Sequence, residues 1–298
     1  AEQTPLIAAQ GIAILLEAGV PPGVVQLLPG QGETVGAQLT GDDRVRGVMF
    51  TGSTEVATLL QRNIASRLDA QGRPIPLIAE TGGMNAMIVD SSALTEQVVI
   101  DVLASAFDSA GQRCSALRVL CLQDEIADHT LKMLRGAMAE CRMGNPGRLT
   151  TDIGPVIDSE AKANIERHIQ TMRSKGRPVF QAVRENSEDA REWQSGTFVA
   201  PTLIELDDFA ELQKEVFGPV LHVVRYNRNQ LPELIEQINA SGYGLTLGVH
   251  TRIDETIAQV TGSAHVGNLY VNRNMVGAVV GVQPFGGCLL YTSDAADE

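Results

Sequence analysis

Apolar residues recur at helical spacing in several parts of the chain. The clearest case is residues 94–107, where Val98, Val102 and Ala106 fall on one face four positions apart. The first such stretch begins after Thr4, which we expect to cap it, with Pro5 in its first turn. We predict further helices at 5–18, 33–39, 54–67, 124–140, 159–174, 231–239 and 252–262.

Short runs of apolar and β-branched residues lie between these helices and predict strands. They are found at 24–28, 45–50, 77–80, 86–90, 118–122, 198–206, 219–226, 245–250 and 268–272. The run at 45–50 is apolar enough to predict a buried strand, and the polar segment 183–194 predicts a solvated surface loop. Strands that alternate with helices along the whole chain indicate an α/β protein with mostly parallel sheets.

Composition narrows the class of protein. The 298 residues are 44% hydrophobic, enough for a large core, and 23 basic against 36 acidic residues give a net charge of -13. Basic residues form no cluster, so we expect no nucleic-acid partner for this segment. No apolar run reaches the roughly 18 residues of a membrane span, and the start lacks the basic residues of a signal peptide. We therefore expect a cytoplasmic protein without a membrane span.

Two stretches offer groups that could bind or activate a substrate. Gly52 and Ser53 follow a strand and precede a helix, where free N–H groups suit a pyrophosphate, although an ordinary helix cap has the same sequence. No G-x-G-x-x-G fingerprint and no P-loop occur. Glu80 ends an apolar strand, so a desolvated carboxylate there would have a raised pKa and act as a general base. The alternative is a strand-end carboxylate that faces water.

Cys114 lies in the segment AGQRCSALR, beside a glycine-containing turn and next to Arg113. This setting could expose the sulfur and lower its pKa, as in a nucleophilic cysteine, but a free cysteine is also often a small buried hydrophobe. No histidine nearby offers a dyad partner. Cys121 and Cys141 lie in apolar patterns and we expect them to be structural. The four cysteines form no C-x-x-C pair and no metal spacing, which predicts reduced thiols and no metal site.

Five motifs occur in order along the chain: FTGSTEV from residue 50, LIAETGGMNAMIV from 77, GQRCSA from 111, KEVFGPV from 214 and QPFGG from 283. Over residues 1–287 the sequence resembles the aldehyde dehydrogenase superfamily. Longer stretches, such as VNRNMVGAVVGVQPFGG, are similar to its L-glutamate γ-semialdehyde (1-pyrroline-5-carboxylate) dehydrogenase branch, joined in some bacteria to a proline dehydrogenase. The resemblance implies the C-terminal part of a Rossmann-type NAD-binding domain in 1–82 and an α/β catalytic domain in 83–287.

The resemblance also implies catalytic roles. Cys114 would attack the aldehyde carbon, the thiohemiacetal would pass hydride to NAD, and water deprotonated by Glu80 would hydrolyse the thioester to L-glutamate. The N–H of Cys114 would stabilise the oxyanion, with a second donor, an Asn, lying upstream of the chain. The alternatives are another semialdehyde dehydrogenase, for instance one for succinate semialdehyde, or a fragment that keeps the fold without turnover.

The resemblance also implies cofactor-binding roles for five residues. The resemblance places Gly52 and Ser53 at the pyrophosphate, Glu2 near the adenosine ribose, Glu215 on the nicotinamide ribose and Phe217 against the nicotinamide. Glu2 would repel a 2′-phosphate, so NAD is expected rather than NADP. FAD would belong only to the proline dehydrogenase half, outside this chain.

The substrate carries a carboxylate remote from its aldehyde, and the resemblance assigns its anchor to Ser115 and to the backbone of Gly277 and Ala278. Phe285 would line the aliphatic middle, whereas a plain flexible loop is the alternative for 277–278. Residues 288–298 depart from the family, so we expect a foreign tail that carries Cys288. We also expect a start truncated relative to the family, low activity and stability for the chain alone, and a homo-oligomer for its intact parent.

Overall fold

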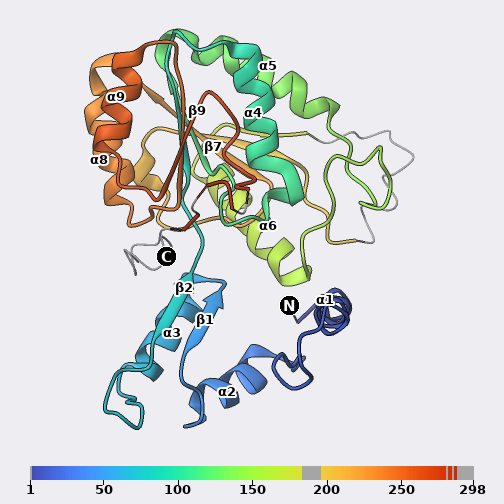
Figure 1. Cartoon of the computed structure of the whole chain (residues 1–298). Coiled ribbons are helices and arrows are strands. Elements are labelled where there is room, and N and C mark those ends of the chain that lie inside the picture. Colours follow the sequence, from blue (N-terminus) through green and yellow to red (C-terminus); the bar gives the residue numbers. More distant parts are fainter. Residues whose placement is uncertain (1, 183–195, 280, 284, 287–298) are drawn as a thin grey trace. The chain divides into compact units, whose positions relative to one another are not determined.

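The computed structural model describes residues 2–182, 196–279, 281–283 and 285–286. The chain divides into two compact units, Ala1–Ala79 and Glu80–Glu298 (Figure 1). Residues 80–82, which we assigned to the cofactor domain, fall in the second unit. No helix of the described part is long and apolar enough to cross a membrane.

The first unit has a small core. Strands β1 (Val48–Thr51) and β2 (Leu77–Glu80, of which Glu80 belongs to the second unit) form a two-stranded sheet. Ala57 and Ile64 of α3 (Thr54–Ile64) pack with Ile75, Leu77 and Ala79. The remaining helices are α1 (Pro5–Glu17), a π-helical turn (Gly32–Gly36) and α2 (Ala37–Gly41).

Three local predictions for this unit are wrong. Residues 24–28 form no strand, only an isolated bridge between Pro22 and Val25, because Gly23 turns the chain with a φ of +90°. Thr4 makes no side-chain cap bond, although Pro5 does start α1. The strand expected to be buried at 45–50 is shorter and half exposed, with Met49 83% exposed.

A seven-stranded sheet organises the second unit, in the order β5-β6-β7-β4-β3-β8-β9. All neighbours are parallel except β5 and β6, which confirms the predicted α/β class. The strands are β3 (Ala86–Val89), β4 (Val119–Gln123), β5 (Val179–Gln181), β6 (Thr202–Leu206), β7 (Val220–Tyr226), β8 (Thr246–His250) and β9 (Asn268–Val271). β5 was not predicted, and the loop expected at 183–194 lies outside the described residues.

Helices cover both faces of this sheet. Because parallel crossovers are right-handed, α4 and α5 lie on one face, and α8 and α9, whose connections run the other way along the sheet, lie on the opposite face (Figure 1). The helices are α4 (Thr95–Phe107), α5 (Asp124–Glu140), α6 (Ser159–Ser174), α8 (Leu231–Ala240) and α9 (Asp254–Ser263). Short 3-10 turns occur at Asp108–Gly111, Phe209–Glu211 and Arg228–Gln230.

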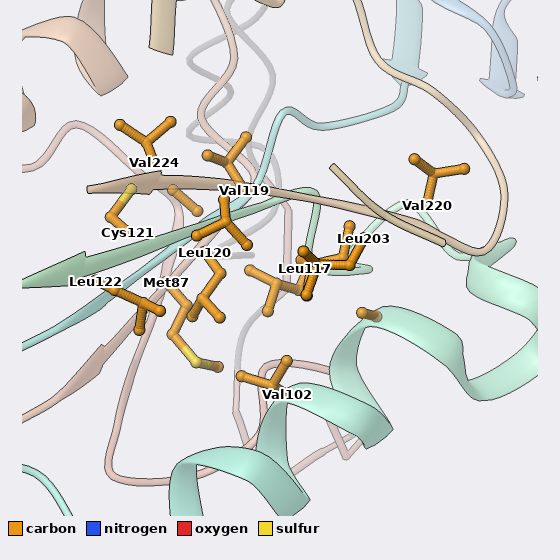
Figure 2. Close-up of a cluster of buried hydrophobic side chains, with 14 of the residues drawn as sticks. Met87, Val102, Leu117, Val119, Leu120, Cys121, Leu122, Leu203, Val220 and Val224 are labelled. Atoms are coloured by element: carbon orange, nitrogen blue, oxygen red, sulfur yellow. The ribbon is translucent and has the colours of Figure 1, made fainter. Parts of the chain in front are cut away.

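The main core covers both faces of the sheet, and one part of it lies between the central strands and α4. Successive residues of β4 point to opposite faces, so Leu120 and Leu122 approach the side of Val102 while Cys121 points away (Figure 2). All five residues of β4 are buried, as are all four of β3. These strands therefore give a rigid base to the loops at their ends.

Candidate active site

Three loops of the second unit meet at the amino ends of β3, β4 and β7. They comprise residues 81–85, 112–118 and 215–219, and hydrogen bonds among Asn85, Arg118 and Glu215 and the neighbouring backbone connect them. We expected polar groups at carboxyl strand ends. That holds for Glu80, the last residue of β2, but in the large sheet the candidate residues gather at the amino edge.

Cys114 follows a tight left-handed turn. Ser109, Ala110 and Gly111 have φ values of 55°, 54° and 65°, so three consecutive residues adopt a conformation that glycine tolerates best. A Cβ on Gly111 would lie 2.2 Å from the carbonyl oxygen of Gly218. The turn therefore packs closely against the loop before β7. Cys114, three residues further on, is half-buried.

Asn85 fixes the chain on both sides of the cysteine. Its Nδ2 donates to the carbonyl oxygens of Cys114, at 2.7 Å, and Ala116, at 2.8 Å, and its Oδ1 accepts from the N–H of Thr246 at 3.1 Å. The side chain is buried, so these bonds are shielded from water. The sequence analysis missed this residue; the available signal was an amide side chain at the entrance of an all-apolar strand.

The thiol of Cys114 does not have the lowered pKa that we expected from Arg113. Burial raises its pKa, and the carboxylates of Glu215 and Glu80 raise it further, while the backbone N–H groups of Ser115 and Cys114 act in the opposite direction. Arg113 is exposed and its Nε donates to Ser109 Oγ at 3.1 Å. In the unliganded chain, Cys114 is therefore a protonated thiol, and two nearby carboxylates oppose its ionisation.

The sequence analysis also missed Arg118, whose side chain lies among these loops. Its side chain is completely buried, and its Nε and Nη2 donate to Glu215 Oε1 at 3.0 and 2.8 Å. Nη1 donates to the carbonyl oxygen of Gly111 at 2.6 Å, and Nη2 to that of Arg113 at 3.0 Å. In sequence, an arginine beside a strand is typical of a surface residue, so only the fold shows its burial.

Glu215 and Phe217 come from the loop before β7. Glu215 packs so closely on Gly82 that a Cβ there would lie 1.7 Å from Glu215 Oε2, which explains a glycine at this position. Phe217 is 45% exposed, and the guanidinium carbon of Arg118 lies 5.1 Å from its ring centroid. The loop thus presents a carboxylate and an aromatic face close to the cysteine turn.

The four expected substrate residues also belong to the second unit. Ser115 is buried, and its carbonyl oxygen accepts from Thr246 Oγ1 at 3.3 Å. Gly277 is exposed with a φ of +82°, which glycine tolerates and other residues rarely adopt. Ala278 is half-buried and Phe285 is exposed. Their binding roles stay predictions.

Three expected cofactor residues lie in the first unit. Ser53 is the N-cap of α3 and its Oγ accepts from the N–H of Val56 at 3.2 Å. A Cβ on Gly52 would lie 2.4 Å from the end of the Phe50 ring, so a larger residue here would require that ring to move. The carboxylate of Glu2 accepts from the N–H of Gly32. The first turn of an 11-residue helix with open N–H groups fits an anionic group such as a pyrophosphate.

Comparison with known proteins supplies close relatives. Residues of the chain are 99% identical over 287 positions to the bifunctional protein PutA of Escherichia coli, covering 96% of the chain and 22% of that protein. A 1-pyrroline-5-carboxylate dehydrogenase of Geobacillus kaustophilus is 34% identical over 297 residues, or 99% of the chain and 56% of that protein. The chain thus spans about a fifth of the PutA proteins that it matches.

Solved structures agree with these relatives. A crystal structure of a bifunctional proline utilization A (PutA) protein superposes with a TM-score of 0.89 at 49% identity. The match covers 97% of the present chain and 28% of the PutA chain. The 1-pyrroline-5-carboxylate dehydrogenase from Thermus with bound NAD gives a TM-score of 0.86 at 36% identity. This match covers 97% of the present chain and 55% of the Thermus chain. The aldehyde dehydrogenase family model matches residues 1–289. The chain belongs to the aldehyde dehydrogenase family.

Proposed function

We propose that this chain is the catalytic segment of an NAD-dependent dehydrogenase that oxidises L-glutamate γ-semialdehyde, the open form of 1-pyrroline-5-carboxylate, to L-glutamate in proline catabolism. The observation that carries the proposal is the 99% identity to a bifunctional PutA across 287 residues that include both Cys114 and Glu80. The 33–34% identical 1-pyrroline-5-carboxylate dehydrogenases support the same substrate.

The nucleophile in this proposal is Cys114. Its sulfur attacks the aldehyde carbon and forms a thiohemiacetal, whose oxyanion receives a hydrogen bond from the Cys114 N–H. Because the pKa of the thiol is raised, the attack needs a base. Glu80 is our candidate, since its charge acts on the sulfur; it would later take a proton from the water that hydrolyses the thioester.

NAD is the proposed cofactor, and it supplies a hydride acceptor when bound. Ser53 and Gly52 would hold the pyrophosphate at the start of α3, and Glu2 would disfavour a 2′-phosphate. Glu215 would bind the nicotinamide ribose hydroxyls and Phe217 would contact the ring. The NAD-bound Thermus relative supports this choice.

The substrate is a small molecule with its own carboxylate. Ser115, with the backbone of Gly277 and Ala278, would bind that carboxylate, and Phe285 would contact the aliphatic carbons. We further propose a cytoplasmic location, a homo-oligomer for the longer protein and no nucleic-acid partner for this segment, whose net charge is -13.

The test is NADH formation from L-glutamate γ-semialdehyde, with succinate semialdehyde as competitor, in this chain and in the 99% identical Escherichia coli relative. We expect a preference for glutamate semialdehyde. Cys114→Ala should reduce kcat by about 1,000-fold or more, because the covalent route is lost. Cys141→Ala, a half-buried thiol at the end of α5, is the matched control and should leave kcat unchanged. A preference for succinate semialdehyde, or turnover retained without Cys114, contradicts the proposal.

A further inference from the structure

Arg118 carries a full positive charge inside the second unit. Its side chain is 0% exposed, and Glu215, itself 13% exposed, is its ion-pair partner. Removing an arginine from water is costly, and a hydrophobic side chain of similar size often gives equal or greater stability. Stability alone is therefore a poor reason for a buried guanidinium at this place.

The contacts of Arg118 point instead to the loops of the candidate site. Two of its nitrogens bind Glu215, and a third binds Gly111 in the left-handed turn. One of the first two also binds the carbonyl oxygen of Arg113, the residue directly before Cys114. A planar fork with fixed donor directions can hold these groups in one geometry, which the single ammonium of lysine cannot do.

The aromatic ring and the next loop residue complete this arrangement. Phe217 lies over the guanidinium at 5.1 Å, and Gly218 accepts from Nη1 at 3.3 Å. The backbone of Arg118 is held as well, since His222 Nδ1 lies 3.1 Å from its carbonyl oxygen. Burial lowers the pKa of His222 to about 3, so this imidazole is neutral and Nδ1 donates. Both ends of Arg118 are thus anchored.

We propose that Arg118 is the positioning residue of this site: its guanidinium fixes Glu215 and Phe217 against the turn that carries Cys114. The inference rests on the proposed function for the roles of Cys114 and Glu215, and it adds the residue that sets their relative geometry. The positive charge of Arg118 also interacts with the Glu215 carboxylate and with the Cys114 sulfur, where it favours the thiolate over the thiol.

The experiment compares Arg118→Lys and Arg118→Met with wild type in the Escherichia coli relative, and labels Cys114 of this chain with iodoacetamide over a pH series. Arg135→Met is the matched control, because Arg135 of α5 also pairs with a glutamate, Glu205 of β6. Melting temperature and circular dichroism report folding for every variant.

We expect Arg118→Lys to fold, to raise KM for NAD and to lower kcat by about 100-fold, the scale of an error of about 1 Å in position. The labelling midpoint of Cys114 should stay near the wild-type pH with lysine, which keeps the charge, and move to higher pH with methionine, which does not. A merely structural role of Arg118 would lower the melting temperature of both Arg118 variants without separate effects on KM, kcat and the labelling midpoint.

Folded Arg118→Lys with wild-type KM for NAD and kcat overturns the proposal, and so does a labelling midpoint that is the same in all variants. If Arg118→Met does not fold, the lysine variant decides. If wild type does not oxidise glutamate semialdehyde, the proposed function fails, whereas the labelling series still decides whether Arg118 controls the Cys114 turn.

Discussion

The surroundings of Cys114 make it harder for its thiol to lose a proton. Burial and the charges of Glu215 and Glu80 raise its pKa above the ordinary 9.0, and two backbone N–H groups compensate only in part. Such a thiol resists adventitious oxidation and alkylation at neutral pH, because only the thiolate is a strong nucleophile. In the proposed reaction, this thiol must therefore give up its proton before it can attack.

This environment predicts the pH dependence of labelling. For Cys114 of the unliganded chain, the alkylation rate should rise with pH and reach its midpoint at a higher pH than that of free cysteine measured alongside, since burial opposes deprotonation. Glu80→Gln removes one negative charge and should move the midpoint to lower pH. Peptide mass spectrometry separates Cys114 from the completely buried Cys121, whose pKa burial raises to about 12.

The control for this series is Glu236→Gln, which removes the same charge from an exposed position on α8. Its midpoint should equal that of wild type. A midpoint at or below that of free cysteine, or no shift with Glu80→Gln, would show that burial and the two carboxylates do not act on the sulfur as described.

At the scale of single residues, the sequence identified the two candidate reactive residues but not the side chains that hold the loops around them. Cys114 and Glu80 were visible because their immediate neighbours, a glycine turn and a strand end, are local in sequence. Asn85 bonds to the backbone of Cys114, about 30 positions later, and Arg118 pairs with Glu215, about 100 positions later. A side chain whose partners are that distant carries no local pattern, so only the fold could identify it.

At the scale of elements, the turn before Cys114 sets the position of its thiol. Gly111→Ala should destabilise the protein by about 2 to 4 kcal/mol, since it adds left-handed strain and a close contact. The added methyl carbon would meet backbone atoms of Gly218 and Ala106, which cannot rotate away. Urea unfolding of the purified chain measures the change.

Gly136→Ala is the matched control for this substitution. Gly136 is exposed inside α5, and a Cβ there would meet nothing within 4 Å. It should stabilise the chain by about 0.5 to 1 kcal/mol, because alanine loses less backbone entropy in a helix. Equal effects of the two substitutions would contradict the account of the turn.

Elements with strong periodicity were predictable, and those set by distant contacts were not. The runs at 77–80 and 86–90 became β2 and β3 because continuous apolar residues between turns favour buried strands. The run at 24–28 has the same composition but follows two prolines and Gly23, and no neighbouring strand pairs with it along its length. β5 is three residues long, too short for a pattern, and exists through its pairing with β6.

At the scale of the whole molecule, the two units differ in how much apolar surface they bury. The cluster of the first unit has five fully buried residues, and large side chains such as Leu6, Ile7 and Met49 stay more than three-quarters exposed. The second unit surrounds a seven-stranded sheet with a continuous core. The family resemblance implied two domains, but the amount of surface that each buries depends on packing and could not be derived from the sequence.

This contrast predicts separate local stabilities. Amide hydrogen exchange at neutral pH should be fastest in α1 and in the sheet of β1 and β2, and slowest in β3, β4 and β7, since exchange from a core strand requires opening of the whole unit. Limited proteolysis should cut within residues 2–79 before it cuts the described strands of the second unit. Protection of β1 equal to that of β4 would mean that the first unit is stabilised by more than its own small core.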